Sequence, residues 1–347
     1  NAANINPAAF VDALFSTFVY QGDGQSNRDI VNGINLSDNG GLVWLKTRGT
    51  AYAHYLNNPG EFTGYASSNA TSAWTTSSNF VTFNNNGFRI PVAYSGANAT
   101  NTTQDMVSWT FRKQPKFFDI VTYSGTGSAR TVSHNLGSVP GMIIVKVTDA
   151  TDDWVVYHRG MDGSAPEDYR MLLNENSARV NATRWNDTAP TSTEFTVDSD
   201  TSVNGNGLNY VAYLFAHNND DGGFGEPGDQ DIIKCGSYTG SGQPTKEIDL
   251  GFEPQWIMVK NSTDTSYGGE DWYIFDNMRG MVTGDGDDPQ LFANKSDAEQ
   301  ATSMMEVMPT GFRVTRTTYN PNVSGETYIY MAIRRGGMQT PTAASDV

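Results

Sequence analysis

Short apolar runs separated by clusters of Gly, Asn, Asp and Ser fill most of the chain, and three of these runs end in a lysine. The three cover residues 43–46, 143–146 and 257–260. Val, Ile, Thr and aromatic residues are frequent in such runs, whereas long stretches with helical spacing are scarce. This pattern predicts an all-β protein with many turns between short strands.

The same order of segments occurs three times along the chain. Each copy opens with a strand that ends in a tyrosine and a Gly-rich turn, at Tyr20, Tyr123 and Tyr238. A short strand, a lysine-ending run, an aromatic strand and a closing strand follow, although the first copy has only a weak echo of the aromatic strand at residues 54–56. The closing strands lie 89, 90 and 93 positions after the tyrosines, at Trp109, Tyr213 and Met331. This spacing indicates one fold used three times.

Each copy has the size of a small β-sandwich or jelly roll that can bury its own two faces. We therefore expect three tandem sandwich domains and not a solenoid. The expected domains are residues 1–115 (the divergent copy), 116–226 and 227–340, with 341–347 as a tail or linker. Polar stretches that contain proline, at residues 113–116 and 218–228, would connect them.

The net charge and the lengths of the apolar runs argue against nucleic-acid binding and against a membrane span. The 347 residues carry a formal net charge of −16, which would repel nucleic-acid phosphates. No run of 18 or more apolar residues occurs, so we expect no membrane span. The single cysteine, Cys235, lies in an apolar run and is expected to be a small buried residue.

The sequence singles out no catalytic residue and no cofactor site. The four histidines, His54, His134, His158 and His217, lack zinc-type spacing, and structural hydrogen bonding is the expected role of His134 and His158. A glycan-cleaving enzyme would need two carboxylates across a cleft. The candidate acids for that alternative are Asp152, Asp153, Asp162, Glu167, Asp168, Glu270, Asp271 and Asp276. Most of them lie in polar loops, where acids commonly form turns.

Two acidic Gly-rich loops are candidates for Ca²⁺ binding because hard oxygen ligands on flexible loops suit this ion. Their acids are Asp220 and Asp221 in one loop and Asp285, Asp287 and Asp288 in the other. Neither loop has the EF-hand pattern, and solvated turns are the preferred interpretation.

Two tryptophans lie outside the repeated pattern. Trp74 and Trp185 occur in loops rich in Ser, Thr and Asn, whereas the other five tryptophans occupy repeat positions and are expected in the core. Trp74 and Trp185 could stack on sugars at a receptor site or anchor a subunit contact. We prefer the subunit contact, because large aromatic residues often anchor interfaces.

Several segments resemble a group of marine phage virion proteins with repeated motifs. These are SHNLGSVPGMIIVK (133–146), EIDLGFEPQWIMVKN (247–261), IIKCGSYTG (232–240) and TYIYMAIRRG (327–336). The resemblance covers copies two and three well and copy one loosely. It implies a tail-fibre-like or other structural protein on a virion exterior, and it transfers no catalytic residue.

The preferred hypothesis is a tail-fibre or spike component, built as a homotrimer, that contacts other virion proteins and host surface glycans or proteins. Loops rich in oxygen-bearing side chains, with scattered aromatic residues, would provide these contacts. A capsid decoration protein that stabilises the shell is the second hypothesis. A glycan-cleaving depolymerase on the same scaffold is the third, by analogy with other phage fibres.

Overall fold

The predicted all-β sandwich fold is confirmed. The computed structural model describes residues 10–77, 80–94, 96–98, 104–225, 228–263, 270–284, 288–315 and 321–336. Their strands form six sheets, and the strands that pair in them are antiparallel. Helical segments within these residues are short: η1 (Val11–Ala13), η2 (Pro166–Asp168), η3 (Thr183–Trp185) and α1 (Thr201–Asn204).

Three groups of strands follow one another along the chain, and we call them repeats 1, 2 and 3. Repeat 1 contains β1 (Phe15–Gln21), β2 (Arg28–Val31), β3 (Gly41–Thr47), β4 (Tyr55–Asn58), β5 (Phe62–Ala66), β6 (Thr82–Asn84), β7 (Gly87–Ile90) and β8 (Asp105–Arg112). Repeat 2 contains β9 (Phe118–Ser124), β10 (Arg130–Ser133), β11 (Pro140–Val147), β12 (Val155–His158), β13 (Tyr169–Leu172), β14 (Val180–Asn181), β15 (Glu194–Val197) and β16 (Asn209–Ala216). Repeat 3 contains β17 (Ile233–Thr239), β18 (Lys246–Asp249), β19 (Pro254–Asn261), β20 (Tyr273–Asp276), β21 (Asp288–Phe292), β22 (Gln300–Thr302), β23 (Met305–Met308), β24 (Gly311–Val314) and β25 (Thr327–Arg334).

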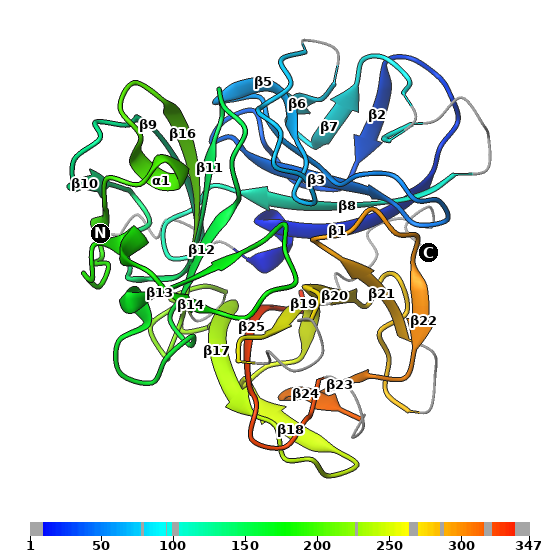
Figure 1. Ribbon diagram of the computed structural model, residues 1–347. Helices are drawn as coiled ribbons and strands as arrows, with labels where there is room; N and C mark the ends of the chain where they lie inside the picture. The colour runs from blue at the N-terminus through cyan, green and yellow to red at the C-terminus, as the bar shows by residue number, and fades with distance from the viewer. Residues whose placement is uncertain are drawn as a thin grey trace, which may run out of the picture.

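The large sheets of the three repeats have the same strand order. It is β1-β8-β3-β4-β5 in repeat 1, β9-β16-β11-β12-β13-β14 in repeat 2 and β17-β25-β19-β20-β21-β22 in repeat 3. A small sheet, β2-β7-β6, β10-β15 or β18-β24-β23, completes each repeat. Figure 1 shows the repeats arranged around a common centre, with repeat 1 in blue and cyan, repeat 2 in green and repeat 3 in yellow to red. The chain is thus a ring of three sandwiches.

The lysine-ending runs form β3, β11 and β19, which are buried on both faces. In β3, Val43 and Leu45 pack in the core between the two sheets of repeat 1. Leu42 and Trp44, which point to the opposite face, belong to a cluster that also contains residues of repeats 2 and 3. Burial on both faces explains why these strands are continuous apolar runs without polar alternation.

The large sheets therefore share a central core, which independent tandem domains would not have. Phe15 and Trp109 of repeat 1 pack edge-on against Trp256 of repeat 3, with ring centroids 6.2 and 6.5 Å apart. Phe111 of repeat 1 contacts Phe215 of repeat 2 at 5.5 Å. The sequence led us to expect that each copy would bury both its faces alone. The second face of each large sheet is instead covered by the neighbouring repeats.

The tyrosine that opens each repeat has the same partner in all three. The hydroxyls of Tyr20, Tyr123 and Tyr238 donate to the carbonyls of Ala97, Val203 and Pro321, at 2.8, 2.6 and 2.8 Å. The next residue in each case is an asparagine, and these three are Asn98, Asn204 and Asn322. Each asparagine accepts a backbone hydrogen bond from the Gly-rich turn and donates its amide back to that turn. The turns are thus fixed by one repeated polar clasp.

We expect Asn204→Ala to destabilise the protein by about 2 kcal/mol, because buried backbone groups would lose their partners. Asn204 is fully buried, accepts from the Thr126 backbone N–H at 2.9 Å, and donates to the carbonyls of Ser128 and Asp198 at 2.7 Å. Urea denaturation would measure the loss. The matched control is Asn206→Ala, since Asn206 is exposed two residues away. Equal effects of the two substitutions would contradict the clasp.

Adjacent repeats meet at three equivalent contacts, which we call seams. In each seam, a loop that begins at the end of the fifth strand of one repeat contacts the next repeat around the ring. These loops are residues 67–74, 172–179 and 292–299. Backbone hydrogen bonds cross the seams from Trp74 N to Thr148 O, Arg179 N to Ser262 O and Glu299 N to Arg48 O, at 2.8, 2.9 and 2.7 Å. Repeat 1 thus contacts repeat 2, repeat 2 contacts repeat 3, and repeat 3 closes the ring on repeat 1.

An aromatic side chain just before the fourth strand occupies each seam. Trp154 Nε1 donates to the carbonyls of Ser67 and Ala70, both at 3.0 Å, and Trp272 Nε1 donates to the carbonyl of Leu172 at 2.9 Å. His54 holds the equivalent place in repeat 1, and its Nδ1 accepts from Trp44 Nε1 at 2.8 Å. Its neutral ring therefore carries the hydrogen on Nε2, beside the carbonyls of Phe292 and Lys295, although Nε2 makes no hydrogen bond of ordinary geometry.

The lysines that end the apolar runs are fully buried in the same seams. Their ammonium groups donate to backbone carbonyls of the preceding repeat in the ring: Lys46 to Ser296 at 3.2 Å, Lys146 to Thr71 at 2.9 Å and Lys260 to Asn176 at 2.7 Å. Burial lowers the pKa of Lys46 and of Lys146 to about 8. These lysines therefore act as structural donors to the loops that join the repeats.

Candidate functional site

Three cavities open at the same end of the large sheets, where the closing strands finish. Each is lined by the first residue after the closing strand: Lys113 after β8, His217 after β16 and Arg335 after β25. Each is also lined by the loop before the central strand, through Asn39, Val139 or Glu253. Their volumes are about 380, 790 and 500 Å³ in repeats 1, 2 and 3. We call them hollows 1, 2 and 3.

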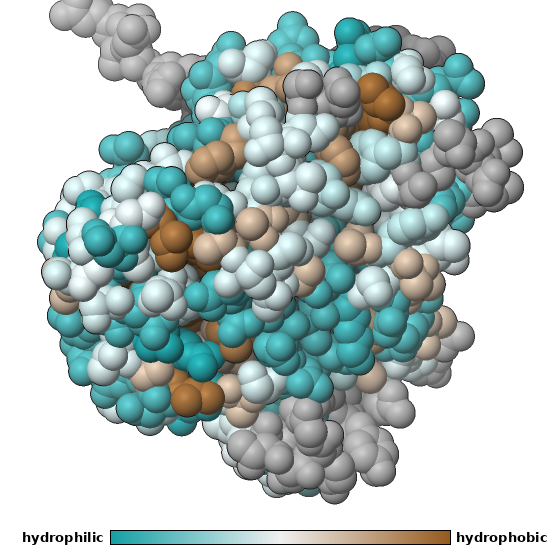
Figure 2. Space-filling view, turned by 45° about the horizontal axis from the view of Figure 1, so that its top comes forward, coloured by the Kyte–Doolittle hydropathy of each residue, from teal (hydrophilic) through white to brown (hydrophobic). Residues whose placement is uncertain are grey.

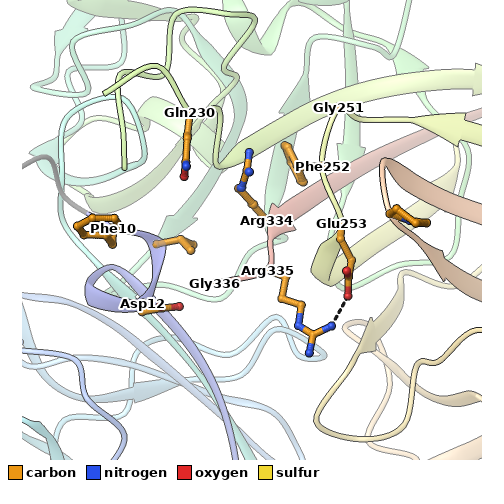
Figure 3. Close-up of a pocket in the computed structure, with 11 residues that line it drawn as sticks. Phe10, Asp12, Gln230, Gly251, Phe252, Glu253, Arg334, Arg335 and Gly336 are labelled. Carbon is orange, nitrogen blue, oxygen red and sulfur yellow. Dashed lines mark hydrogen bonds and ion pairs between the residues drawn. The ribbon is translucent and has the colours of Figure 1, made fainter. Parts of the chain in front are cut away.

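Ion pairs occupy hollows 1 and 3. In hollow 1, Lys113 Nζ lies 3.8 Å from Oδ1 of Asp119, which also lines the cavity, and 3.1 Å from Oε1 of Glu61, which lies outside the lining. In hollow 3, Figure 3 shows the Arg335 side chain directed toward Glu253, with which it forms an ion pair. The basic group after the closing strand therefore has an acidic partner within the protein in both repeats.

The remaining charged groups of hollow 3 are partly shielded from solvent. The Arg334 guanidinium lies over the Phe252 ring, 5.8 Å from its centroid, and donates to the Asp231 carbonyl at 3.4 Å. Asp12, which comes from η1, also lines this hollow (Figure 3), and burial raises the pKa of its carboxyl. Hollow 3 thus joins the first described helical turn to the last strand.

Hollow 2 has a different set of polar groups. His217 Nδ1 accepts from the Cys235 backbone N–H at 3.2 Å, so the neutral ring carries its hydrogen on Nε2. Burial, helped by the nearby Arg159, lowers the pKa of His217 to about 4. Among the described residues, no hydrogen bond or ion pair involves the side chain of Arg159 or Glu167, and both line the cavity. Hollow 2 therefore presents polar groups without partners of their own.

The rings of His134 and His158 bond to the backbone, as the sequence led us to expect. His134 contacts the Thr191 carbonyl through Nε2 at 3.3 Å and accepts from Leu136 N at Nδ1. His158 Nδ1 accepts from Gly160 N, so Nε2–H donates to the Tyr330 carbonyl of repeat 3 at 3.0 Å. Cys235 is buried, and burial raises the pKa of its thiol.

We expect stability to fall as the pH drops below 6.5, and His158 to cause a measurable part of the fall. Burial lowers the pKa of His158 to about 3, with smaller effects of the same sign from Arg159 and His217. The unfolded chain takes up this proton below pH 6.5 and the folded chain does not. At pH 4.5 this difference amounts to about 2–3 kcal/mol.

Urea midpoints of unfolding between pH 7.5 and 4.5 would measure this dependence. The comparison variant is His158→Asn, because Asn58 holds the equivalent place in repeat 1. This variant lacks the titrating imidazole. The slope of its unfolding free energy against pH should therefore be smaller by the equivalent of about one bound proton over this range. An unchanged slope would show that His158 is not the group responsible.

The residues singled out for Ca²⁺ do not form a shared site where they are described. Asp221 Oδ1 accepts from Asn219 N, and Asp288 is buried, with its carboxylate accepting from Val282 N and Met305 N. Asp220 adopts a positive φ of 62°, which suits a turn. Asp285 and Asp287 lie outside the described residues. Within the described part of the chain, no group of three or more His, Cys, Asp or Glu side chains could hold a metal ion.

The two tryptophans outside the repeat pattern differ in exposure. Trp185 is only 2% exposed, donates from Nε1 to the Tyr169 carbonyl and packs against Tyr157. It is therefore a core residue of repeat 2, and the prediction of a receptor or subunit contact was wrong for it, because η3 directs its ring inward. Trp74 is half-buried against Phe62 and donates to the Thr63 carbonyl. An external contact of Trp74 stays a prediction.

Several candidate acids of the depolymerase alternative hold loops or seams. Asp276 is fully buried and paired with Arg279, and Asp162 accepts from Ser164 and pairs with Arg179 at 3.1 Å. These hydrogen bonds lower the pKa of the Asp162 carboxyl. Glu167 differs from them because it lines hollow 2. Asp162 and Asp276 thus have structural roles that explain their presence.

The sequence did not point to hollow 2. Arg159, which directly follows His158, was not among the candidate residues, and His217 was considered only as one of four histidines. A comparison of the three positions that follow the closing strands, Lys113, His217 and Arg335, would have shown that repeat 2 departs from the basic residue used in the others. The unpaired state of Arg159 depends on loops distant in sequence.

No helix among the described residues is long and apolar enough to cross a membrane.

The family comparison covers the whole ring. No curated protein matches the chain. A family model described as a domain of unknown function, DUF7483, matches residues 12–335, from η1 to the residue after β25, and so includes all three repeats. The chain therefore belongs to the DUF7483 family.

Proposed function

We propose that the protein is a structural component of a phage particle, placed on the virion exterior as part of a tail fibre or spike that contacts the host surface. The supporting observation is where the resemblance to phage virion proteins falls in the fold. The four segments that carry it supply β11, β18 with β19, β17 and β25. Most of these strands build the shared core, so the resemblance concerns the scaffold of the ring.

The buried polar groups fit a scaffold role. The seam lysines and His158 bond to backbone of neighbouring repeats, and the Tyr–Asn clasps fix the turns. The face in Figure 2 is mostly hydrophilic, with separate hydrophobic residues. Such a ring with polar loops suits binding to other surfaces. Contacts with other virion proteins and with host glycans or proteins, and a homotrimer, are parts of the proposal.

A capsid decoration protein is the second candidate, and the ring is the observation that favours it. Three equivalent sandwiches in one chain could match a local threefold position of a shell, because symmetric partners present equivalent contacts.

The location of the protein in the particle tests both candidates. Antibodies against the purified chain would be applied to intact particles and imaged by electron microscopy. Label on the tail supports the fibre or spike role, and label distributed over the shell supports decoration. Particles that contain none of the protein by mass spectrometry would overturn both candidates.

A further inference from the structure

We propose that hollow 2 binds a neutral, hydroxyl-rich oligosaccharide. This inference rests on the proposed function, since it names the class of host-surface ligand that the exterior of the ring would contact. The cavity of about 790 Å³ lies within the range of small-molecule sites and can hold two or three sugar units. Its lining comes from five segments: Lys116, residues 137–140, residues 157–167, residues 189–192 and residues 217–221.

The three equivalent hollows provide an internal comparison. Lys113 in hollow 1 and Arg335 in hollow 3 are held by Glu61 and Glu253. Hollow 2 has the neutral His217 at this position, and the guanidinium of Arg159 is not paired with any described residue. Arg159 is exposed, so its guanidinium is accessible to a ligand from solvent. In repeat 2, a basic side chain is thus available to a ligand. In repeats 1 and 3, the basic side chains of Lys113 and Arg335 are paired with acids of the protein itself.

The available groups include both donors and acceptors. Arg159 and the Nε2–H of His217 donate, whereas the Glu167 carboxylate accepts. Lys116 already donates to the Asp221 carbonyl, and its charge is balanced by the Asp221 carboxylate at the same rim. The formal charges of Lys116 and Arg159 therefore cancel those of Glu167 and Asp221. A ligand with many hydroxyls can donate and accept at once, and it needs no net charge to match this lining.

Apolar groups beside these polar ones suit the C–H faces of a sugar ring. Val139 is 52% exposed at the rim, and Pro166 and Pro190 line the wall. The Tyr157 ring is buried against Trp185, so the site has no exposed aromatic platform of its own. Recognition would rest on hydrogen bonds, with Arg159 as the main donor because charged donors bond more strongly than neutral ones.

The test titrates the full chain with maltotriose, mannotriose and galactotriose, and with trigalacturonate as a charged probe. Calorimetry and saturation-transfer NMR would detect binding. We expect at least one neutral trisaccharide to bind, and Arg159→Ala to weaken it at least about tenfold. The matched control is Arg335→Ala in hollow 3, which should bind like the unmodified chain. Thermal unfolding of both variants would show whether each is folded.

Two results would overturn the proposal: binding of trigalacturonate without any neutral trisaccharide, or equal binding by Arg159→Ala and the unmodified chain. Absence of binding by all probes would overturn it as well. None of these results changes the location of the protein in the particle, which antibody labelling reports separately. A failure of hollow 2 and a failure of the virion role are therefore distinguishable.

Discussion

Replacing Trp154 with alanine is expected to lower the free energy of unfolding by about 3–5 kcal/mol, the usual cost of removing a large buried aromatic side chain. Trp154 is fully buried at the seam between repeats 1 and 2. Its ring stacks on Tyr213 with centroids 6.4 Å apart, and its Nε1 donates to two carbonyls of repeat 1. The substitution would leave a cavity and remove the donor of both carbonyls. Guanidinium denaturation followed by tryptophan fluorescence and circular dichroism would measure the loss.

Two further variants separate packing from hydrogen bonding at this seam. Trp154→Phe keeps most of the apolar volume and loses only the donor, so it should cost about 1–2 kcal/mol. Trp185→Ala is the matched control, because Trp185 is equally buried but its Nε1 donates to the Tyr169 carbonyl within its own repeat. Hydrogen exchange would show whether residues 67–74 lose protection in Trp154→Ala. Unchanged protection there would mean that the two repeats do not depend on this contact.

The strands of the fold could be predicted from sequence because their pattern is local. Apolar runs, Gly-rich turns and the regular spacing of Tyr20, Tyr123 and Tyr238 each depend on a few adjacent residues. The seams could not be predicted in this way. Lys46 meets Ser296 across 250 positions of the chain, and nothing near Lys46 in sequence specifies that partner.

A signal for the ring was nevertheless present in the sequence. A lysine at the end of an apolar strand is ordinarily solvent-exposed, and its recurrence in three copies suggested only a strand end. Fully buried lysines require polar partners, and each of these lysines has one in its own repeat and one in the preceding repeat of the ring. The family match agrees with the ring as the unit, because it runs from η1 to the end of β25 and includes all three repeats.

The candidate site illustrates the same limit. Whether Arg159 is paired depends on loops from residues 137–140, 189–192 and 217–221, which meet only in the folded chain. Trp185 shows the converse, because its polar neighbours in sequence suggested exposure while Tyr157 and Tyr169 enclose it. Local polarity predicts loops well, and it predicts poorly which side chain of a loop turns inward.

Replacing Arg279 with methionine is expected to destabilise the ring by about 3–5 kcal/mol, because a buried carboxylate would lose its ionic partner. Arg279 Nε lies 2.6 Å from Asp276 Oδ2, and both side chains are fully buried. The same guanidinium contacts Glu299, which also pairs with Arg48 of repeat 1. This network closes the ring between repeats 3 and 1, where the chain has no covalent connection.

The double variant Asp276→Asn with Arg279→Met should recover most of the lost stability. Asn58 occupies the equivalent position in repeat 1, and an amide oxygen can still accept from Trp109 Nε1, which in the unmodified protein donates to Asp276 at 2.9 Å.

Arg313→Met is the surface control. Arg313 pairs with Glu247 and Glu306 near solvent, so its replacement should change the stability little. Urea denaturation in low salt and in 1 M NaCl would compare the three. The effect of Arg279→Met should persist in salt, because the buried pair is poorly screened. A double variant no more stable than the single one would show that Asp276 is not the group left without a partner.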